Sequence, residues 1–271
     1  MLSLSEISTV GASYREDLRA YAAAGFDGIG IWESKLGEDD DADLAALRGS
    51  GLHATNCVPA VPSILPNTVI AGPEDVDVRV GALCESMHRL ARYEPDCVLC
   101  LTGPAGGRNA DEARQLVVDG LRRLAAAADS AGVRLGLEPI HASERDGLST
   151  VTTIPETLEL LEDARLPDVG IMIDLWHLWD TPEIERHLAE HVGRITGVHV
   201  SDWFGDGRHD RALPGEGSSR TRELVAVLRE AGWRGAWVVE IFGDPARPDS
   251  LWALDVDEAA RRAYAAMAAI A

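Results

Sequence analysis

Short apolar runs and amphipathic runs alternate eight times along this chain of 271 residues. The apolar runs are rich in Val, Ile and Leu and predict buried parallel strands at 6–11, 27–32, 52–58, 96–102, 133–138, 169–174, 195–200 and 236–241. The amphipathic runs predict helices at 17–24, 41–49, 74–93, 109–131, 155–165, 182–191, 219–231 and 256–269. This alternation favours a single α/β domain over 1–271, folded as a (β/α)8 TIM barrel.

Glycine follows several of the predicted helices, as in Ala24-Gly25, Ala131-Gly132 and Ala231-Gly232. A glycine at this position is the usual helix stop, because it adopts the left-handed backbone without strain. A doubly wound open sheet is the alternative fold. It usually carries a phosphate-binding glycine fingerprint after its first strand, and the segment 9–13 has none.

Net charge restricts the partners that this chain can have. A formal charge of -20 without a Lys/Arg cluster disfavours nucleic acid and membrane surfaces. The chain has no apolar run long enough to span a membrane, and its start does not resemble a signal peptide, so we expect a cytoplasmic protein. We interpret its cysteines as buried thiols, although two of them form a CxxC; they are Cys57, Cys84, Cys97 and Cys100.

Four predicted strands in the C-terminal half end on, or carry near their end, a carboxylate or an imidazole. These residues are Glu138, Asp174, His199 and Glu240. The carboxyl ends of barrel strands converge on one face, and an unpaired buried carboxylate is costly. The pattern therefore predicts one divalent cation bound at that face, and an ion-pair network across the barrel mouth is the alternative. Mostly oxygen ligands favour Mn²⁺, with Mg²⁺, Co²⁺ or Zn²⁺ as other choices.

Further candidates lie on loops that follow the strands. Long loops at 59–73, 139–153 and 201–218 are expected to form the rim of the site. Their polar candidates, and those of neighbouring loops, are His177, His141, Glu144, Glu33 and Arg211. For Arg211 a surface salt bridge is the alternative to substrate binding.

Aromatic and glycine-rich segments complete this rim. Either the tryptophans form a wall for the apolar face of a sugar or they pack the barrel top; they are Trp32, Trp176, Trp179 and Trp203. The turn 214–217 is a weak candidate for presenting backbone amides to an anion. His53, at a strand start, should lie at the opposite end, and the helical His88, His187 and His191 should be solvated.

Several of these motifs resemble the xylose-isomerase-like TIM barrel superfamily, which includes sugar phosphate isomerases and epimerases and the AP endonuclease 2 type. The similarity is most specific between about 133 and 241. The matching segments are Gly136-Leu137-Glu138-Pro139, Asp174 to His177, Val198-His199-Val200-Ser201-Asp202, Arg211 to Gly217, and Glu240. Segments around Phe242, Trp252 and Arg261 also resemble a branch that includes lyases cleaving 3-keto C-glycosides.

The resemblance implies a role for each matching residue. It implies that Glu138, Asp174, His199 and Glu240 bind one metal, and that His177, Glu144 and Arg211 contact the substrate. It also implies a homo-oligomer. Endonuclease IV fits less well, because the ends of the second, third and fourth predicted strands lack the histidines that its three-metal cluster needs.

These features together predict a metal-dependent sugar isomerase or epimerase. Glu138 and Glu240 would be its catalytic acid and base and would work through an enediolate. Loss of a leaving group from the same enediolate would instead give a dehydratase or another β-eliminating lyase, and the sequence does not choose between them. A barrel that binds a sugar without turnover is a further alternative.

Overall fold

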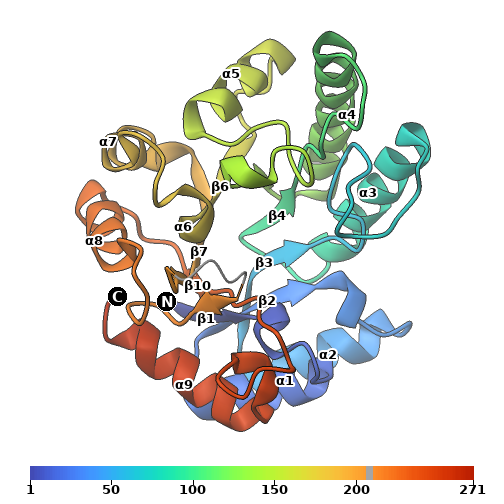
Figure 1. Cartoon of the computed structure of the whole chain (residues 1–271). Coiled ribbons are helices and arrows are strands. Elements are labelled where there is room, and N and C mark those ends of the chain that lie inside the picture. The colour runs from blue at the N-terminus through green and yellow to red at the C-terminus, as the bar shows by residue number, and fades with distance from the viewer. Residues whose placement is uncertain (206–209) are drawn as a thin grey trace.

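A computed structural model describes residues 1–205 and 210–271. Eight parallel strands close into a barrel in the order β1-β10-β7-β6-β5-β4-β3-β2. Their bounds are β1 Leu2–Ser5, β2 Gly28–Trp32, β3 His53–Val58, β4 Cys97–Cys100, β5 Leu135–Leu137, β6 Gly170–Asp174, β7 Ile195–Val200 and β10 Trp237–Val239. Figure 1 shows this barrel at the centre with helices around it. The predicted TIM barrel is thus confirmed.

The helices lie outside the barrel and cover its strands. The longer ones are α1 Tyr14–Ala24, α2 Asp40–Ser50, α3 Val76–Ala91, α4 Ala110–Ala131, α5 Ile154–Ala164, α7 Ile184–Glu190, α8 Thr221–Ala231 and α9 Val256–Ala268. A single helical turn, α6 Leu175–Leu178, follows β6 directly. Within the described ranges, no helix is both long and apolar enough to cross a membrane.

Local sequence explains where these helices begin and end. The side chains of Ser13, Asp75 and Asn109 each accept a hydrogen bond from a backbone amide in the first turn of α1, α3 and α4. Gly25 and Gly232 end α1 and α8 with φ of 101° and 105°, in the left-handed region. The glycine stop signals therefore act as the sequence predicts.

The predicted first strand at 6–11 is wrong. The strand is β1, Leu2–Ser5, and Glu6–Thr9 form a 3₁₀ helix behind it. Glu6 is fully buried, and its Oε2 accepts the backbone N–H of Trp32 at 2.8 Å. Lys35 Nζ donates to the carbonyl of Glu6 at 3.0 Å and to that of Thr9 at 2.9 Å. These long-range bonds satisfy backbone groups that a strand would have paired with its neighbours.

Two glycines inside the barrel leave room for bulkier neighbouring side chains. A Cβ added to Gly136 would lie 2.5 Å from Thr196 Oγ1, and one added to Gly197 would lie 2.5 Å from Met172 Sδ. The bulkier neighbours therefore fill the space beside the glycines.

The cysteines agree with the prediction of buried thiols. Cys57, Cys97 and Cys100 are buried and free, and Cys84 is partly buried and free.

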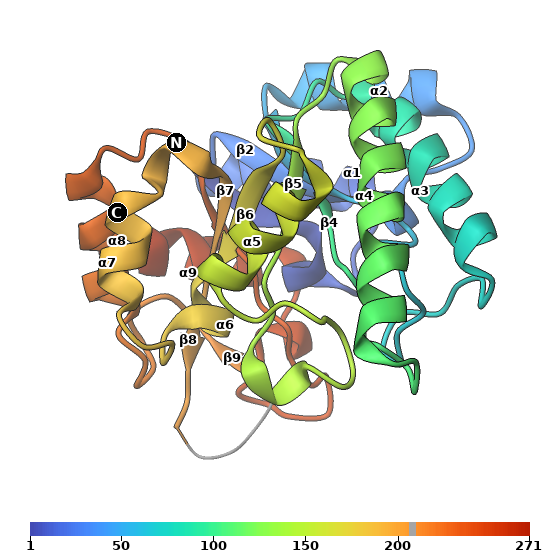
Figure 2. The same cartoon turned by 90° about the horizontal axis from the view of Figure 1, so that it is seen from above.

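A small antiparallel sheet, missed by the sequence analysis, stands at one end of the barrel. β8, Asp202–Trp203, pairs with β9, Arg211–Ala212, inside the long loop after β7. Figure 2 shows α6, β8 and β9 together at one end of the barrel. Part of the predicted loop 201–218, namely 206–209, lies outside the described residues.

Candidate active site

The four strand-end residues converge in space. Asp174 ends β6 and His199 lies within β7, while Glu138 and Glu240 directly follow β5 and β10. His199 Nδ1 lies 3.2 Å from Glu240 Oε2 and 3.6 Å from Glu138 Oε1. One ligand atom from each of Glu138, Asp174 and His199 lies within 4.8 Å of the others. All four side chains are buried.

Two short polar side chains inside the barrel contact this cluster, and the sequence analysis did not name them as candidates. Asn56 of β3 reaches across the barrel, and its Nδ2 lies 3.0 Å from His199 Nε2. Ser5 of β1 donates from Oγ to Glu240 Oε1 at 3.2 Å and accepts the indole N–H of Trp32 at 3.0 Å. A polar residue inside an apolar strand was the only sequence signal for either contact.

Arg211, the first residue of β9, completes the cluster. Its Nη1 donates to Asp174 Oδ2 at 2.7 Å and to Glu240 Oε2 at 3.2 Å. The guanidinium lies over the rings of Phe242 and Trp176, at 4.6 and 5.0 Å from their centroids. The Arg211 side chain is therefore a buried ion-pair partner and not the surface salt bridge considered as the alternative.

The glycine turn after β9 has an internal partner. Asp202 Oδ2 accepts the amide of Gly215 at 3.1 Å, and its Oδ1 accepts the amide of Ser219 at 2.9 Å. The turn at 214–217 thus directs the Gly215 amide to a buried carboxylate and not to an anion from solution. Asp202 fixes the loop that carries Arg211.

Burial and the close charges shift several pKa values. Burial raises the pKa of Glu138 to about 7. Burial lowers the pKa of His199, but the carboxylates of Glu240 and Glu138 outweigh it and raise the pKa to about 10. Burial raises the pKa of Glu240, but His199 and then Arg211 outweigh it, so the net pKa is lowered. Burial, followed by the charge of Arg211, lowers the pKa of His177 well below its ordinary value.

The cluster suits a divalent cation. Glu138 Oε1 and His199 Nδ1 are buried and lack a hydrogen-bond partner among the described residues. These two atoms lie 3.6 Å apart with the carboxylates of Glu240 and Asp174 beside them, and burying three carboxylates together is costly unless positive charge offsets them. A set of carboxylate oxygens and one imidazole nitrogen fits Mn²⁺, Co²⁺ and Zn²⁺ and also accommodates Mg²⁺.

A cavity of about 470 Å³ opens over the cluster. Most of the predicted site residues line it: Glu138, Glu144, His177, His199, Arg211, Glu240, Trp32 and Trp176. Phe242 and Trp252, which the site prediction omitted, line it as well. Asp174 is fully buried beneath it, bound to Arg211.

Other predicted candidates lie elsewhere. His141 hydrogen-bonds Ser143 Oγ at 2.8 Å and Asp180 at 3.3 Å, and packs beside Trp176 outside the lining of the cavity. Glu33 accepts hydrogen bonds from Ser86 Oγ at 2.6 Å and from the amide of Ala60 at 2.9 Å. Both side chains thus have partners within the protein.

The other tryptophans and histidines named in the sequence analysis do not line the cavity. Trp179 and Trp203 stack on each other with centroids 5.2 Å apart, so they pack the barrel top and do not line the cavity. His53 bonds Asp96 at the opposite end, as expected, and His88 is exposed. His187 and His191 are half-buried and stacked, so the prediction that they are solvated is only partly right; with Glu190 they form a second group of potential ligands on α7.

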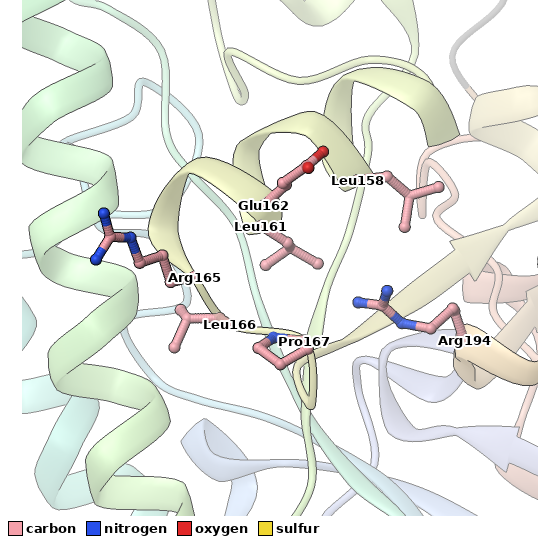
Figure 3. Close-up of a pocket in the computed structure, with 7 residues that line it drawn as sticks. All are labelled: Leu158, Leu161, Glu162, Arg165, Leu166, Pro167 and Arg194. Atoms are coloured by element: carbon pink, nitrogen blue, oxygen red, sulfur yellow. The ribbon is translucent and has the colours of Figure 1, made fainter.

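A separate hollow of about 330 Å³ lies beside α5, at the end of the barrel where the strands begin (Figure 3). Its residues include Leu161 of α5, Pro167 and Arg194. The Arg194 side chain donates to the carbonyl of Val169 at 2.9 Å. The described residues around it bring no carboxylates and imidazoles together, so the chemistry concentrates at the opposite face.

Comparison with known proteins agrees with this fold. The family model described as a xylose isomerase-like TIM barrel matches residues 18–267, and the chain belongs to this family. A solved structure described as the IOLI protein with a bound zinc atom superposes with a TM-score of 0.80 at 21% identity, over 99% of this chain and 97% of that one.

The curated relatives are enzymes of several reaction types. The 3-dehydroshikimate dehydratase of Pseudomonas putida is 26% identical over 89% of this chain but only 38% of its own length. The D-psicose 3-epimerase of Agrobacterium fabrum is 24% identical over 85% of this chain and 80% of its own. The chain therefore spans about two fifths of the dehydratase and most of the epimerase.

Proposed function

We propose that this chain is a divalent-metal-dependent sugar isomerase or epimerase that moves a proton on a carbon next to a carbonyl. The observation that carries the proposal is the pair Glu138 and Glu240, buried at the cavity with carboxylate oxygens 3.6 and 3.2 Å from His199 Nδ1. Two carboxyl groups beside one bound carbon can serve in turn as base and acid.

Glu240 is the base in one direction of this reaction. Its lowered pKa keeps it ionised, and Ser5 holds Oε1, so Oε2 faces the centre of the cluster. Glu138, ionised when a metal is bound, would take up a proton from a substrate hydroxyl and return one from the other side. If the proton returns to the same carbon, the configuration of that carbon is inverted, which is epimerisation. If it returns to the adjacent carbon, a ketose and an aldose are interconverted, which is isomerisation. The reverse reaction exchanges the two roles.

A divalent cation would be held by Glu138, Asp174, His199 and Glu240, with Mn²⁺ the first choice and Mg²⁺, Co²⁺ or Zn²⁺ the others. When bound, it supplies a Lewis acid that acidifies the neighbouring C–H bond and stabilises the negative charge of the enediolate. The unpaired Glu138 Oε1 and His199 Nδ1 support this assignment.

The other residues of the cavity orient the substrate. His177 stays neutral at ordinary pH because its pKa is lowered; its Nε2 accepts a hydrogen bond from Arg211 Nη2 at 3.3 Å, so its Nδ1–H is left to donate to a substrate oxygen. Arg211 adds a fixed positive charge near the developing oxyanion. Glu144 accepts hydroxyl hydrogen bonds at the rim, and Trp32 and Trp176 pack against the apolar face of a sugar ring.

A β-eliminating lyase or dehydratase acting on a keto-sugar or related cyclic ketone is the second candidate. The alignment with a 3-dehydroshikimate dehydratase over 89% of this chain favours it. The same base would remove the proton, and the protonated Glu138 would give its proton to the departing oxygen. An endonuclease is not proposed, because apolar residues at the ends of β3 and β4, Val58 and Leu101, line the cavity.

Proton exchange in deuterated water, followed by NMR, tests the proposal. Metal-loaded protein is incubated with ketoses, aldoses and keto-sugars. Deuterium entering one carbon together with a new epimer or isomer supports the first candidate, whereas loss of water or another leaving group supports the second. Glu240→Gln should abolish exchange and keep the fold, while His53→Gln, at the far end of the barrel, should change neither. Full exchange in Glu240→Gln would refute the assignment of the base.

A further inference from the structure

One wall of the cavity is apolar from floor to rim. Val58 of β3, Leu99 of β4 and the following Leu101 point into the barrel, and Ile140 and Leu148 after β5 continue the surface. These side chains belong to a hydrophobic cluster distinct from the main core. The main core instead takes Val98 and Cys100, the residues of β4 that face outward. The cavity thus has a charged side and an apolar side.

The loop 59–73 extends the apolar wall to solvent. Val69 and Ile70 of this loop line the cavity. Val69 is 63% exposed, the highest value among the exposed large hydrophobic residues of the described chain. Val69 alone would need no explanation, but with Ile70 it continues the apolar wall, and a contiguous apolar surface at a cavity is typical of one that a ligand covers.

The apolar side has few groups that could bind hydroxyls. Among described residues, the polar side chains that line the cavity are the charged and imidazole groups already assigned, with no hydroxyl or carboxamide. The indole N–H of Trp32 is given to Ser5, and that of Trp252 to the carbonyl of Ile241. The indole N–H of Trp176 has no partner among the described residues, but it lies on the charged side, beside Arg211 and His177. A sugar filling the whole cavity would leave hydroxyls unpaired against Leu99 and Leu101, which is unfavourable.

We propose that the substrate has two parts: a polyhydroxylated carbonyl part and an apolar substituent the size of an aryl ring. The carbonyl part, which rests on the proposed function, lies against the charged cluster. The aryl part lies between Leu99, Leu101 and the loop residues Val69 and Ile70. The volume of about 470 Å³ agrees with a two-part ligand, since sites for such compounds span about 300–1,000 Å³.

Binding of two inert probes tests the apolar part alone. Phenyl β-D-glucopyranoside and methyl β-D-glucopyranoside have the same sugar and no ketone, so neither can be enolised. Calorimetry with the metal-loaded chain, supported by fluorescence of the tryptophans that line the cavity, gives both dissociation constants. We expect the phenyl compound to bind about 30-fold more tightly, as burial of one ring predicts. Equal affinities, or no binding of the phenyl compound, would overturn the proposal.

Loop variants locate the ring. Val69→Ser and Ile70→Ser should each reduce the phenyl preference about three- to fivefold, and leave methyl glucoside binding unchanged. Val78→Ser is the matched control, because Val78 is 58% exposed on α3 and does not line the cavity. A phenyl preference that both loop variants retain in full would refute the placement.

A second pair of probes separates this inference from the proposed function. Phenyl and methyl glucosides oxidised to a ring ketone are assayed for deuterium exchange. If both ketones exchange deuterium with equal efficiency, the proposed function is supported and the proposal of an aryl substituent is refuted. A strong phenyl preference in binding, without exchange of either ketone, would keep the aryl part and count against proton transfer on this class of ketone.

Discussion

Metal binding should release protons, in a number that depends on pH. The proposed ligands His199 and Glu138 have pKa values raised to about 10 and about 7, so both are protonated in the metal-free protein at low pH. A protonated imidazole has no lone pair for a cation, and a protonated carboxyl is a poor ligand. Glu240, with its lowered pKa, is already ionised. Each raised pKa therefore weakens metal binding below it.

The two pKa values set the size of the effect. Near pH 8, His199 is almost fully protonated and Glu138 mostly ionised, so binding should release about one proton; near pH 6 it should release about two. Competition by these protons should weaken the apparent dissociation constant roughly a thousandfold between pH 8 and pH 6. That factor corresponds to about 4 kcal/mol of binding free energy.

Calorimetry in buffers of different ionisation enthalpy measures both quantities. Mn²⁺ is titrated into the metal-free chain at each pH, and the slope of the observed enthalpy against buffer enthalpy gives the proton count. His53→Gln is the control, because His53 bonds Asp96 at the other end of the barrel. A slope near zero at pH 6, or a dissociation constant that changes less than tenfold, would refute the assignment of His199 and Glu138 as ligands.

Three further outcomes are expected. Asn56→Ala should weaken metal binding about 10- to 100-fold, because His199 loses the contact that orients its ring; calorimetry measures this, and an unchanged affinity would contradict it. Ser5→Ala should lower kcat about 10- to 100-fold with little change in metal affinity, because Glu240 loses a charge-assisted hydrogen bond; an equal effect on both would point to a merely structural role. The metal-free chain should lose stability as pH rises. The folded pKa of His199 exceeds its unfolded value, so its contribution is complete below about pH 6.5 and lost towards pH 10, as urea unfolding would show.

Much of the fold and part of the site could be predicted from local sequence. Strand and helix periodicities are local, and eight repeats of the same alternation leave few topologies other than a barrel. The convergence of Glu138, Asp174, His199 and Glu240 follows from the same topology, since the carboxyl ends of parallel strands meet at one face. The residue type at each strand end was therefore enough to locate the cluster.

The tertiary structure alone decided which other side chains reach that cluster. Ser5 and Glu240 are 235 positions apart, and Asn56 and His199 are 143 apart, so their contacts depend on the closure and width of the barrel. The position of Arg211 depends on β9, a strand of two residues that is too short to show a strand periodicity in the sequence.

The failed predictions have the same origin. Glu33 and His141 lie on loops after strands, as predicted, but partners distant in the sequence, such as Ser86 and Asp180, bind their side chains away from the cavity. The first strand was displaced because Lys35 binds the carbonyls of Glu6 and Thr9 from another loop. Local sequence determined the elements and the residues at their ends. Side-chain orientation was decided by hydrogen bonds and charges that only the closed barrel brings within a few ångströms.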